Sequence, residues 1–316
     1  MNTQIQIELW PECRCNRCKF CNLVLSSELR GDGSHSNPNR LLTSEEKCEY
    51  LDKAIAYLHT IDWNTYDTLL LRGGEVFNEY QAMIVPRVEI FIHDISALIK
   101  EGKIKKVFLV TGLKYPYENS LLGLVINLFK ANSIDITKQI MIGTSWDSQY
   151  RFTDLSYSFW KDNMEILKHY NIEVHVTSIL TEDFIHKYWK QDKEILKLMN
   201  NHFDFIAPQG KPELLSLEGF FPKRTECLKF LQELKNSKQY SGIWKRLLHQ
   251  NYRRAESIYF TERNELQTRD LAEFSTVFEG DRRDTSKCGH PAEYACYQDS
   301  DACFLCDINM LETLVE

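Results

Sequence analysis

The stretch Thr-Leu-Leu-Leu-Arg-Gly-Gly-Glu, residues 68–75, decides the fold class. Its apolar run is typical of a strand that is buried on both faces of a parallel sheet. The glycine pair that follows predicts a sharp turn out of the strand. Runs of the same kind recur along the first 210 or so residues, separated by segments long enough for crossover helices. We therefore expect an α/β protein built on parallel strands.

The pattern predicts six strands and six helices. The strands are expected at residues 4–10, 68–72, 106–112, 139–144, 173–180 and 203–208. The helices are expected after Thr43 and at residues 83–100, 120–131, 155–170, 184–200 and 223–236. The first helix has the clearest start, because Thr43 and Glu46 have the spacing of a capping box.

Six β-α units in series predict a partial (β/α)6, TIM-like barrel of parallel strands. This core would take residues 1–210. The alternation then stops, and residues 211–316 are expected to form a mostly helical, Cys-rich C-terminal extension. The domain prediction is thus a barrel core followed by an extension that carries a metal site.

The composition excludes several classes of protein. Of the 316 residues 43% are hydrophobic, which suits a packed core and not a disordered chain. No apolar run is long enough to span a membrane, and the N-terminus does not read as a signal peptide. We therefore expect a cytoplasmic protein with no membrane association, whose ten cysteines are thiols or metal ligands.

The net charge of −7 argues against a general nucleic-acid coat protein, which would be basic. Residues 222–254 nevertheless hold a marked excess of lysine and arginine. This segment is either a solvated helical face or a surface for a substrate or partner that carries phosphate.

Four cysteines lie within nine residues directly after the first predicted strand: Cys13, Cys15, Cys18 and Cys21. So dense a cluster points to thiolate ligation of zinc or of an iron–sulfur cluster. The Cys-x-x-Cys-x-x-Cys run is the spacing that ferredoxin-type loops use for a cluster. Its position at the carboxyl end of a strand also fits, since α/β barrels build their active sites on that face.

The run Cys-Asn-x-Cys-Lys-Phe-Cys resembles the signature of the radical S-adenosylmethionine (radical SAM) superfamily. Cys18 and Cys21 match its last two ligands, and Phe20 fills the aromatic position before the last cysteine. The usual first spacing falls on Arg14, so the first ligand is either Cys13 or Cys15. The Gly73-Gly74-Glu75 turn resembles the family's Gly-Gly-Glu motif; its alternative interpretation is an ordinary tight turn.

The resemblance implies a [4Fe–4S] cluster held by three of the four cysteines, with S-adenosylmethionine bound to the remaining iron. Reduction of the cluster would cleave the cofactor to a 5′-deoxyadenosyl radical that abstracts a substrate hydrogen. Gly73, Gly74 and Glu75 would bind the methionyl amino group. Ser145 and Asp147 would contact the ribose hydroxyls and Arg151 the carboxylate, although Asp147 could instead cap a helix and Arg151 could be a surface residue. An electron donor such as a flavodoxin or ferredoxin is implied as a partner.

A second group of metal-type ligands lies near the C-terminus. Its members are Cys288, His290, Cys296, Cys303 and Cys306. They predict a second metal site, either structural zinc or a further iron–sulfur cluster.

Three hypotheses for the function remain open at this point. The first is a radical SAM enzyme with an unknown substrate, for which modification of a nucleotide, nucleic acid or peptide is compatible with the sequence. The second is a zinc-stabilised module that binds nucleic acid or protein without catalysis. The third is a radical SAM activase that acts on a partner enzyme. Metal content separates the second hypothesis from the other two, and a large co-purifying partner would favour the third.

Overall fold

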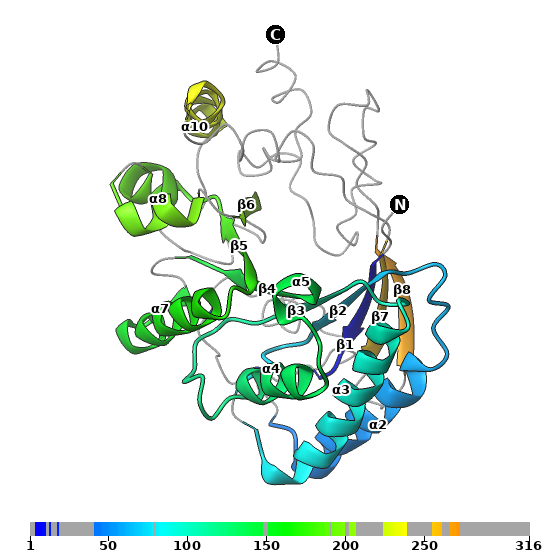
Figure 1. Ribbon diagram of the computed structural model, residues 1–316. Helices are drawn as coiled ribbons and strands as arrows, with labels where there is room; N and C mark the ends of the chain where they lie inside the picture. Colours follow the sequence, from blue (N-terminus) through cyan, green and yellow to red (C-terminus); the bar gives the residue numbers. More distant parts are fainter. Residues whose placement is uncertain are drawn as a thin grey trace, which may run out of the picture. The chain divides into compact units, whose positions relative to one another are not determined.

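The computed structural model describes residues 4–10, 13, 18, 41–78, 80–147, 151–189, 191–199, 202–206, 224–238, 255–260 and 266–271 (Figure 1). Contacts between residues divide the chain into two units. Unit 1 comprises Met1–Thr144, Arg151–Val174 and Ala255–Leu271, and unit 2 comprises Ser145–Tyr150, His175–Arg254 and Ala272–Glu316.

Unit 1 is built on a parallel sheet. Its strands are β1 (Gln4–Glu8), β2 (Thr68–Arg72), β3 (Lys106–Val110), β4 (Ile140–Ser145) and β7 (Ala255–Phe260). They pair in the order β4-β3-β2-β1-β7, all parallel, and β8 (Leu266–Leu271) is antiparallel to β7. The prediction of an α/β protein with parallel strands is confirmed. Because parallel strands share a direction, the segments that follow β1, β2 and β3 leave the sheet at one edge.

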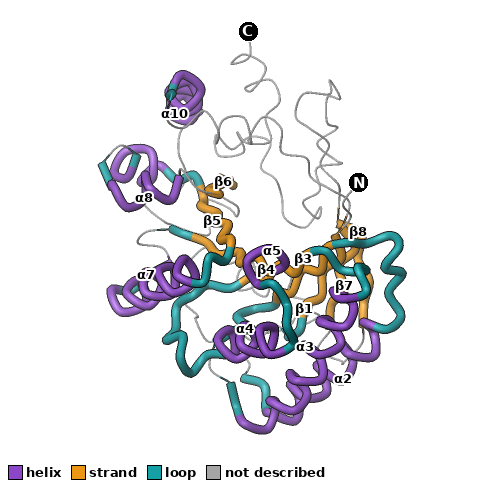
Figure 2. The backbone as a smooth tube through the Cα atoms, viewed as in Figure 1, coloured by secondary structure: helices purple, strands orange, loops and turns teal. Residues whose placement is uncertain are grey.

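Helices cover this sheet, as the crossover pattern predicts. The main ones are α2 (Ser44–Leu58), α3 (Val85–Lys100), α4 (Leu121–Ala131) and α7 (Asp154–His169). Figure 1 shows α2, α3 and α4 along one side of the sheet, and α3 packs against both of the others. Two short helices, η1 (Ala82–Ile84) and α5 (Ile136–Gln139), complete the connections. Figure 2 shows strands and helices alternating through these segments.

Alternate residues of the first four strands form the sheet's contribution to the core. Each is at most 1% exposed, because side chains of one face recur every second residue. These residues are Ile5, Ile7, Leu69, Leu71, Val107, Leu109, Ile140 and Ile142. The apolar runs read from the sequence are therefore buried strands.

The predicted start of α2 is confirmed. The Glu46 amide donates to the Thr43 hydroxyl at 3.2 Å, and the Thr43 amide donates to the Glu46 carboxylate at 2.8 Å. Both halves of the capping box are thus formed. The buried face of the helix includes Cys48, Leu51 and Leu58.

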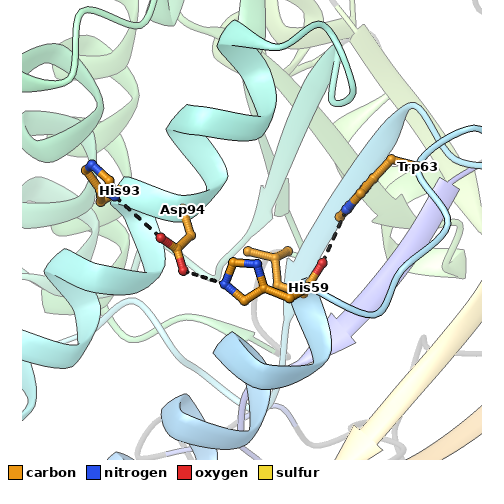
Figure 3. A network of polar contacts seen from close by, with 5 residues as sticks. His59, Trp63, His93 and Asp94 are labelled. Carbon is orange, nitrogen blue, oxygen red and sulfur yellow. Dashed lines mark hydrogen bonds and ion pairs between the residues drawn. The ribbon is translucent and has the colours of Figure 1, made fainter.

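The C-terminal end of α2 is joined to the middle of α3 by a polar network at the surface (Figure 3). His59, which caps the end of α2, places its Nε2 2.8 Å from the Oδ2 of Asp94 on α3. The Nδ1 of His93 lies 3.4 Å from the other oxygen of Asp94. The Trp63 indole donates to the Leu58 carbonyl at 3.2 Å, which anchors the chain that leaves α2.

Unit 2 contains β5 (Glu173–Ile179) from His175 on, paired in parallel with β6 (His202–Ile206). Its helices are the π-helix η2 (Phe184–Tyr188), α8 (Lys193–Met199) and α10 (Arg224–Asn236). The rings of Phe184 and Trp189 both pack edge-on against Phe230 of α10, with centroids 6.1 and 5.0 Å apart.

Two sequence-based expectations differ from the structure. The single helix expected at 184–200 is interrupted at Trp189, whose backbone is extended. Its buried ring packs on Phe230 and its indole donates to Glu233 at 3.0 Å, so tertiary packing ends the helix there. The region after residue 210, expected to be mostly helical, contains α10 but also β7 and β8. Pairing of β7 with β1 along its length explains this, since strand pairing is decided by distant partners.

Within the described part of the chain, no helix is both long and apolar enough to cross a membrane.

Candidate functional site

The carboxyl ends of β1 and β2 are tied together by backbone hydrogen bonds. The Leu9 amide donates to the Arg72 carbonyl at 2.9 Å, and the Gly74 amide donates to the Trp10 carbonyl at 3.0 Å. A Cβ atom on Gly73 would lie 2.2 Å from the Trp10 oxygen, closer than any side chain can approach. Gly73 is therefore required so that the chain leaving β2 can pass beside the chain that enters the cysteine loop.

Glu75 follows this turn, and its side chain points into the protein. The residue is 3% exposed. The Thr111 hydroxyl donates to its Oε1 at 2.8 Å, and the Gly112 amide donates to its Oε2 at 2.6 Å. The carboxylate of the Gly-Gly-Glu turn is thus held by the residues directly after β3. A Cβ atom on Gly112 would lie 2.8 Å from Oε2, so glycine is needed there to admit the carboxylate.

A chain of hydroxyl groups extends this network. The oxygens of Thr111 and Tyr115 lie 2.6 Å apart. Because the single hydroxyl hydrogen of Thr111 points to Glu75, Tyr115 is the donor in this second contact. The Leu113 amide also donates to the Thr111 oxygen, at 3.3 Å. The network thus fixes both the carboxylate and the turn after β3.

Burial raises the pKa of the Glu75 carboxyl above its ordinary value, because a buried charge loses its hydration. The hydrogen bonds from Thr111 and Gly112 and the positive charge of Lys114 act in the opposite direction. A buried carboxyl with a perturbed pKa at the carboxyl end of a parallel sheet is typical of a functional site.

Cys18 of the cysteine loop lies near the same place. The ammonium group of Lys114 donates to the Sγ of Cys18 at 3.2 Å. Cys13 and Cys18 are both half-buried. Cys15 and Cys21 lie outside the described residues. The structure therefore brings one cysteine of the loop next to the turn after β3, where Glu75 is also held.

The other predicted cofactor residues divide between the two units. Ser145 ends β4 and is half-buried, and Asp147 is 3% exposed; both belong to unit 2. The Ile179 amide donates to the Asp147 Oδ1 at 2.7 Å, so this carboxylate secures the end of β5. Arg151 is half-buried and belongs to unit 1, three residues before α7 begins. In unit 1, Lys114 contacts Cys18, and its positive charge acts on the carboxyl of Glu75.

Sequence reasoning missed the residues after β3. Thr111, Gly112, Lys114 and Tyr115 all belong to the network, although none was a candidate. The signal that could have found them is the one that identified Gly73-Gly74-Glu75, namely a glycine beside polar residues at the end of a buried strand.

The predicted second metal site at Cys288, His290, Cys296, Cys303 and Cys306 lies outside the described residues. Among the residues that are described, Glu182, His186 and Glu226 form a group of metal-type ligands within 4.8 Å of one another. His186 Nε2 lies 3.0 Å from the Glu226 carboxylate, and this ion pair between η2 and α10 accounts for the arrangement.

No protein-family model matches the chain, and no curated protein matches it. Solved structures do match. Native anSMEcpe with bound AdoMet and Cp18Cys peptide is similar with a TM-score of 0.44 and 13% identity, over 74% of this chain and 59% of that one. Native anSMEcpe with bound AdoMet is similar with a TM-score of 0.43 and 16% identity, over 73% of this chain and 59% of that one. This chain thus spans less than two thirds of their length.

Proposed function

We propose that the protein is a radical SAM enzyme whose parallel sheet belongs to a partial (β/α)6 barrel. Three of Cys13, Cys15, Cys18 and Cys21 would hold a [4Fe–4S] cluster. When bound, this cluster and S-adenosylmethionine would supply a 5′-deoxyadenosyl radical that abstracts a hydrogen atom from a substrate not yet identified.

One observation carries the proposal: Cys18 of the cysteine loop and Glu75 of the Gly-Gly-Glu turn both contact the short segment that follows β3. The Lys114 ammonium contacts Cys18, and the Glu75 carboxylate is held by Thr111 and Gly112 two or three residues earlier. The two motifs are 50 or more residues apart in sequence. An ordinary tight turn after β2 would not need a buried carboxylate beside a cysteine loop.

The donor set fits the implied group. Thiolates are the usual ligands of iron–sulfur clusters, and the described cysteines of the loop are half-buried. Gly73 carries no Cβ atom, which lets the turn pass directly beside the Trp10 carbonyl, just before the cysteine loop. Glu75 accepts a hydrogen bond from the Thr111 side chain and from the Gly112 and Phe77 backbone amides, and a carboxylate has capacity for about four. It can therefore hold the turn after β3 and still accept from the ammonium group of a methionyl cofactor.

The remaining assignments are part of the same proposal. Ser145 and Asp147 would bind the ribose hydroxyls. Arg151 would bind the cofactor carboxylate. A flavodoxin or ferredoxin would supply the electron. The cysteines and histidine at 288–306 would hold a second metal, which is either zinc or iron–sulfur.

Anaerobic reconstitution with iron and sulfide tests the proposal. Reduced protein supplied with S-adenosylmethionine is expected to release 5′-deoxyadenosine. Cys18→Ala and Cys21→Ala should lose this activity, and comparison of Cys13→Ala with Cys15→Ala should identify the first ligand. Cys48→Ala is the matched control, since Cys48 is a buried thiol on α2 whose Sγ lies 3.7 Å from the Met83 carbonyl oxygen.

The metal content decides between the proposal and a zinc-stabilised binding module. Colourless protein that contains zinc alone, with no iron bound after reconstitution, would overturn the enzymatic proposal. Iron bound in Cys48→Ala but lost in Cys18→Ala would support it.

A further inference from the structure

Lys114 is the one residue seen to connect the two motifs of the proposed site within the described part of the chain. Its Nζ lies 3.2 Å from the Sγ of Cys18, and the residue is half-buried. Its side chain passes over Gly112: a Cβ atom there would lie 3.2 Å from the Lys114 Cε. The same Cβ atom would lie 2.8 Å from the Glu75 carboxylate, and the positive charge of Lys114 acts to lower the pKa of that carboxyl.

The backbone holds Lys114 in this position. The preceding residue, Leu113, is buried and has a φ of 54°, the left-handed conformation that leucine seldom adopts. The Asn163 side chain on α7 donates to the carbonyls on both sides of Lys114, those of Leu113 at 2.9 Å and Tyr115 at 2.7 Å. A conformation that costs free energy persists only where its surroundings determine it, and such positions are typical of functional sites.

The opposite end of the same strand offers a comparison. Lys106 begins β3, and its Nζ lies 3.4 Å from both the Glu173 carboxylate and the Met141 thioether sulfur, which is not a metal ligand of the proposed cluster. Lys114, which follows β3, directs its ammonium group to a cysteine sulfur. The two lysines therefore differ in their partner although both are half-buried.

We propose that Lys114 is a positioning residue for the cluster: its N–H···S hydrogen bond to Cys18 raises the reduction potential of the group bound there. This inference rests on the proposed function, because it needs Cys18 to be a cluster ligand. Neither the cysteine signature nor the Gly-Gly-Glu turn assigns a role to a residue after β3.

The direction of the effect follows from charge. Uptake of one electron from the external donor adds one negative charge next to the Cys18 sulfur. A cation and a hydrogen-bond donor at that sulfur stabilise the reduced state more than the oxidised state, so the potential rises. Half-burial strengthens this effect, because solvent and salt screen the charge less than at an exposed site.

The test compares Lys114→Met, Lys114→Gln and Lys114→Arg with the wild type. Methionine keeps the apolar stem but removes charge and donor, glutamine keeps a neutral donor on a shorter chain, and arginine keeps both charge and donor. Each protein is reconstituted anaerobically, its iron and sulfide are measured, and its potential is determined by EPR-monitored redox titration without S-adenosylmethionine. Lys106→Met is the matched control.

We expect the potential of Lys114→Met to be more negative than that of the wild type. Lys114→Gln should lie between them, and Lys114→Arg and Lys106→Met should match the wild type. If both neutral variants fail to hold iron while the arginine and control variants load fully, that result also supports a role at Cys18.

Full loading with an unchanged potential in Lys114→Met or Lys114→Gln would overturn the inference and leave the proposed function intact. An equal shift in Lys106→Met would also overturn it, because the effect would then not depend on the contact with Cys18. If wild-type protein binds no iron–sulfur cluster, the proposed function itself fails, which the iron and sulfide analysis reveals before any potential is measured.

Discussion

Two carboxylates of this protein form polar networks in different surroundings. Glu75 accepts hydrogen bonds from Thr111 and Gly112 inside unit 1. Asp94 contacts His59 and His93 at the surface between α2 and α3 (Figure 3). Glu75 is 3% exposed, whereas the side chain of Asp94 is 19% exposed and those of its partners His59 and His93 are 60% and 71% exposed.

The difference shows that the number of hydrogen bonds does not measure what a network contributes. Water can replace any partner of Asp94 that is removed, so the loss is small. Around Glu75 no water replaces a lost partner without rearrangement, so each donor left alone carries its full desolvation cost. Stability and proposed function therefore depend on the buried network far more than on the exposed one.

The largest expected effect on the free energy of unfolding is at the buried network of Glu75. Glu75→Ala leaves the Gly112 amide and the Thr111 hydroxyl without their acceptor and opens a cavity beside them. We expect the free energy of unfolding to fall by about 3 kcal/mol, measured by urea denaturation followed by circular dichroism. A loss below about 1 kcal/mol, the size typical of exposed pairs, would remove the distinction between the two networks.

The contribution of Glu75 to the free energy of unfolding should depend on pH, and we expect this effect to be intermediate in size. Burial raises the folded-state pKa of Glu75 above its ordinary value of 4.5, so between the unfolded and folded pKa values the folded state binds more protons. The contribution of Glu75 to stability is therefore full below the unfolded pKa and is lost as pH rises through the folded pKa. Glu75→Gln cannot titrate and serves as the reference.

We expect the stability of the wild type, relative to Glu75→Gln, to decrease as pH rises above about 4.5, the ordinary pKa of a glutamate carboxyl. Urea denaturation at several pH values measures this difference. If the stability of the wild type relative to Glu75→Gln stays constant or increases with pH, the folded-state pKa of Glu75 is not raised. Burial would then not outweigh the hydrogen bonds and the charge of Lys114, which lower this pKa.

The smallest effect is expected at the surface. Asp94→Ala removes the acceptor shared by His59 and His93, but all three side chains remain accessible to water. The free energy of unfolding should change by less than about 1 kcal/mol, measured in the same way as for Glu75→Ala. A loss as large as at Glu75 would show that the link between α2 and α3 matters for folding, contrary to its exposure.

Local patterns in the sequence predicted much of the fold. All six predicted strands have counterparts in β1 to β6, and the capping box of α2 is formed. These features depend on neighbouring residues, since an apolar run or a Thr-x-x-Glu spacing carries its own physical consequence. The helix expected at 184–200 failed because the packing of Trp189 on Phe230, far along the chain, outweighed local helix preference.

By itself the sequence determined the cysteine loop, the Gly-Gly-Glu turn and the α/β class, because each follows from a pattern of residues that are close together in the sequence. Only the tertiary structure decided that β7 pairs beside β1, that Thr111 and Gly112 hold Glu75, and that Lys114 meets Cys18 across 96 positions of sequence. Such contacts arise when parallel strands bring their carboxyl ends to one edge, and no local pattern specifies which side chains then meet.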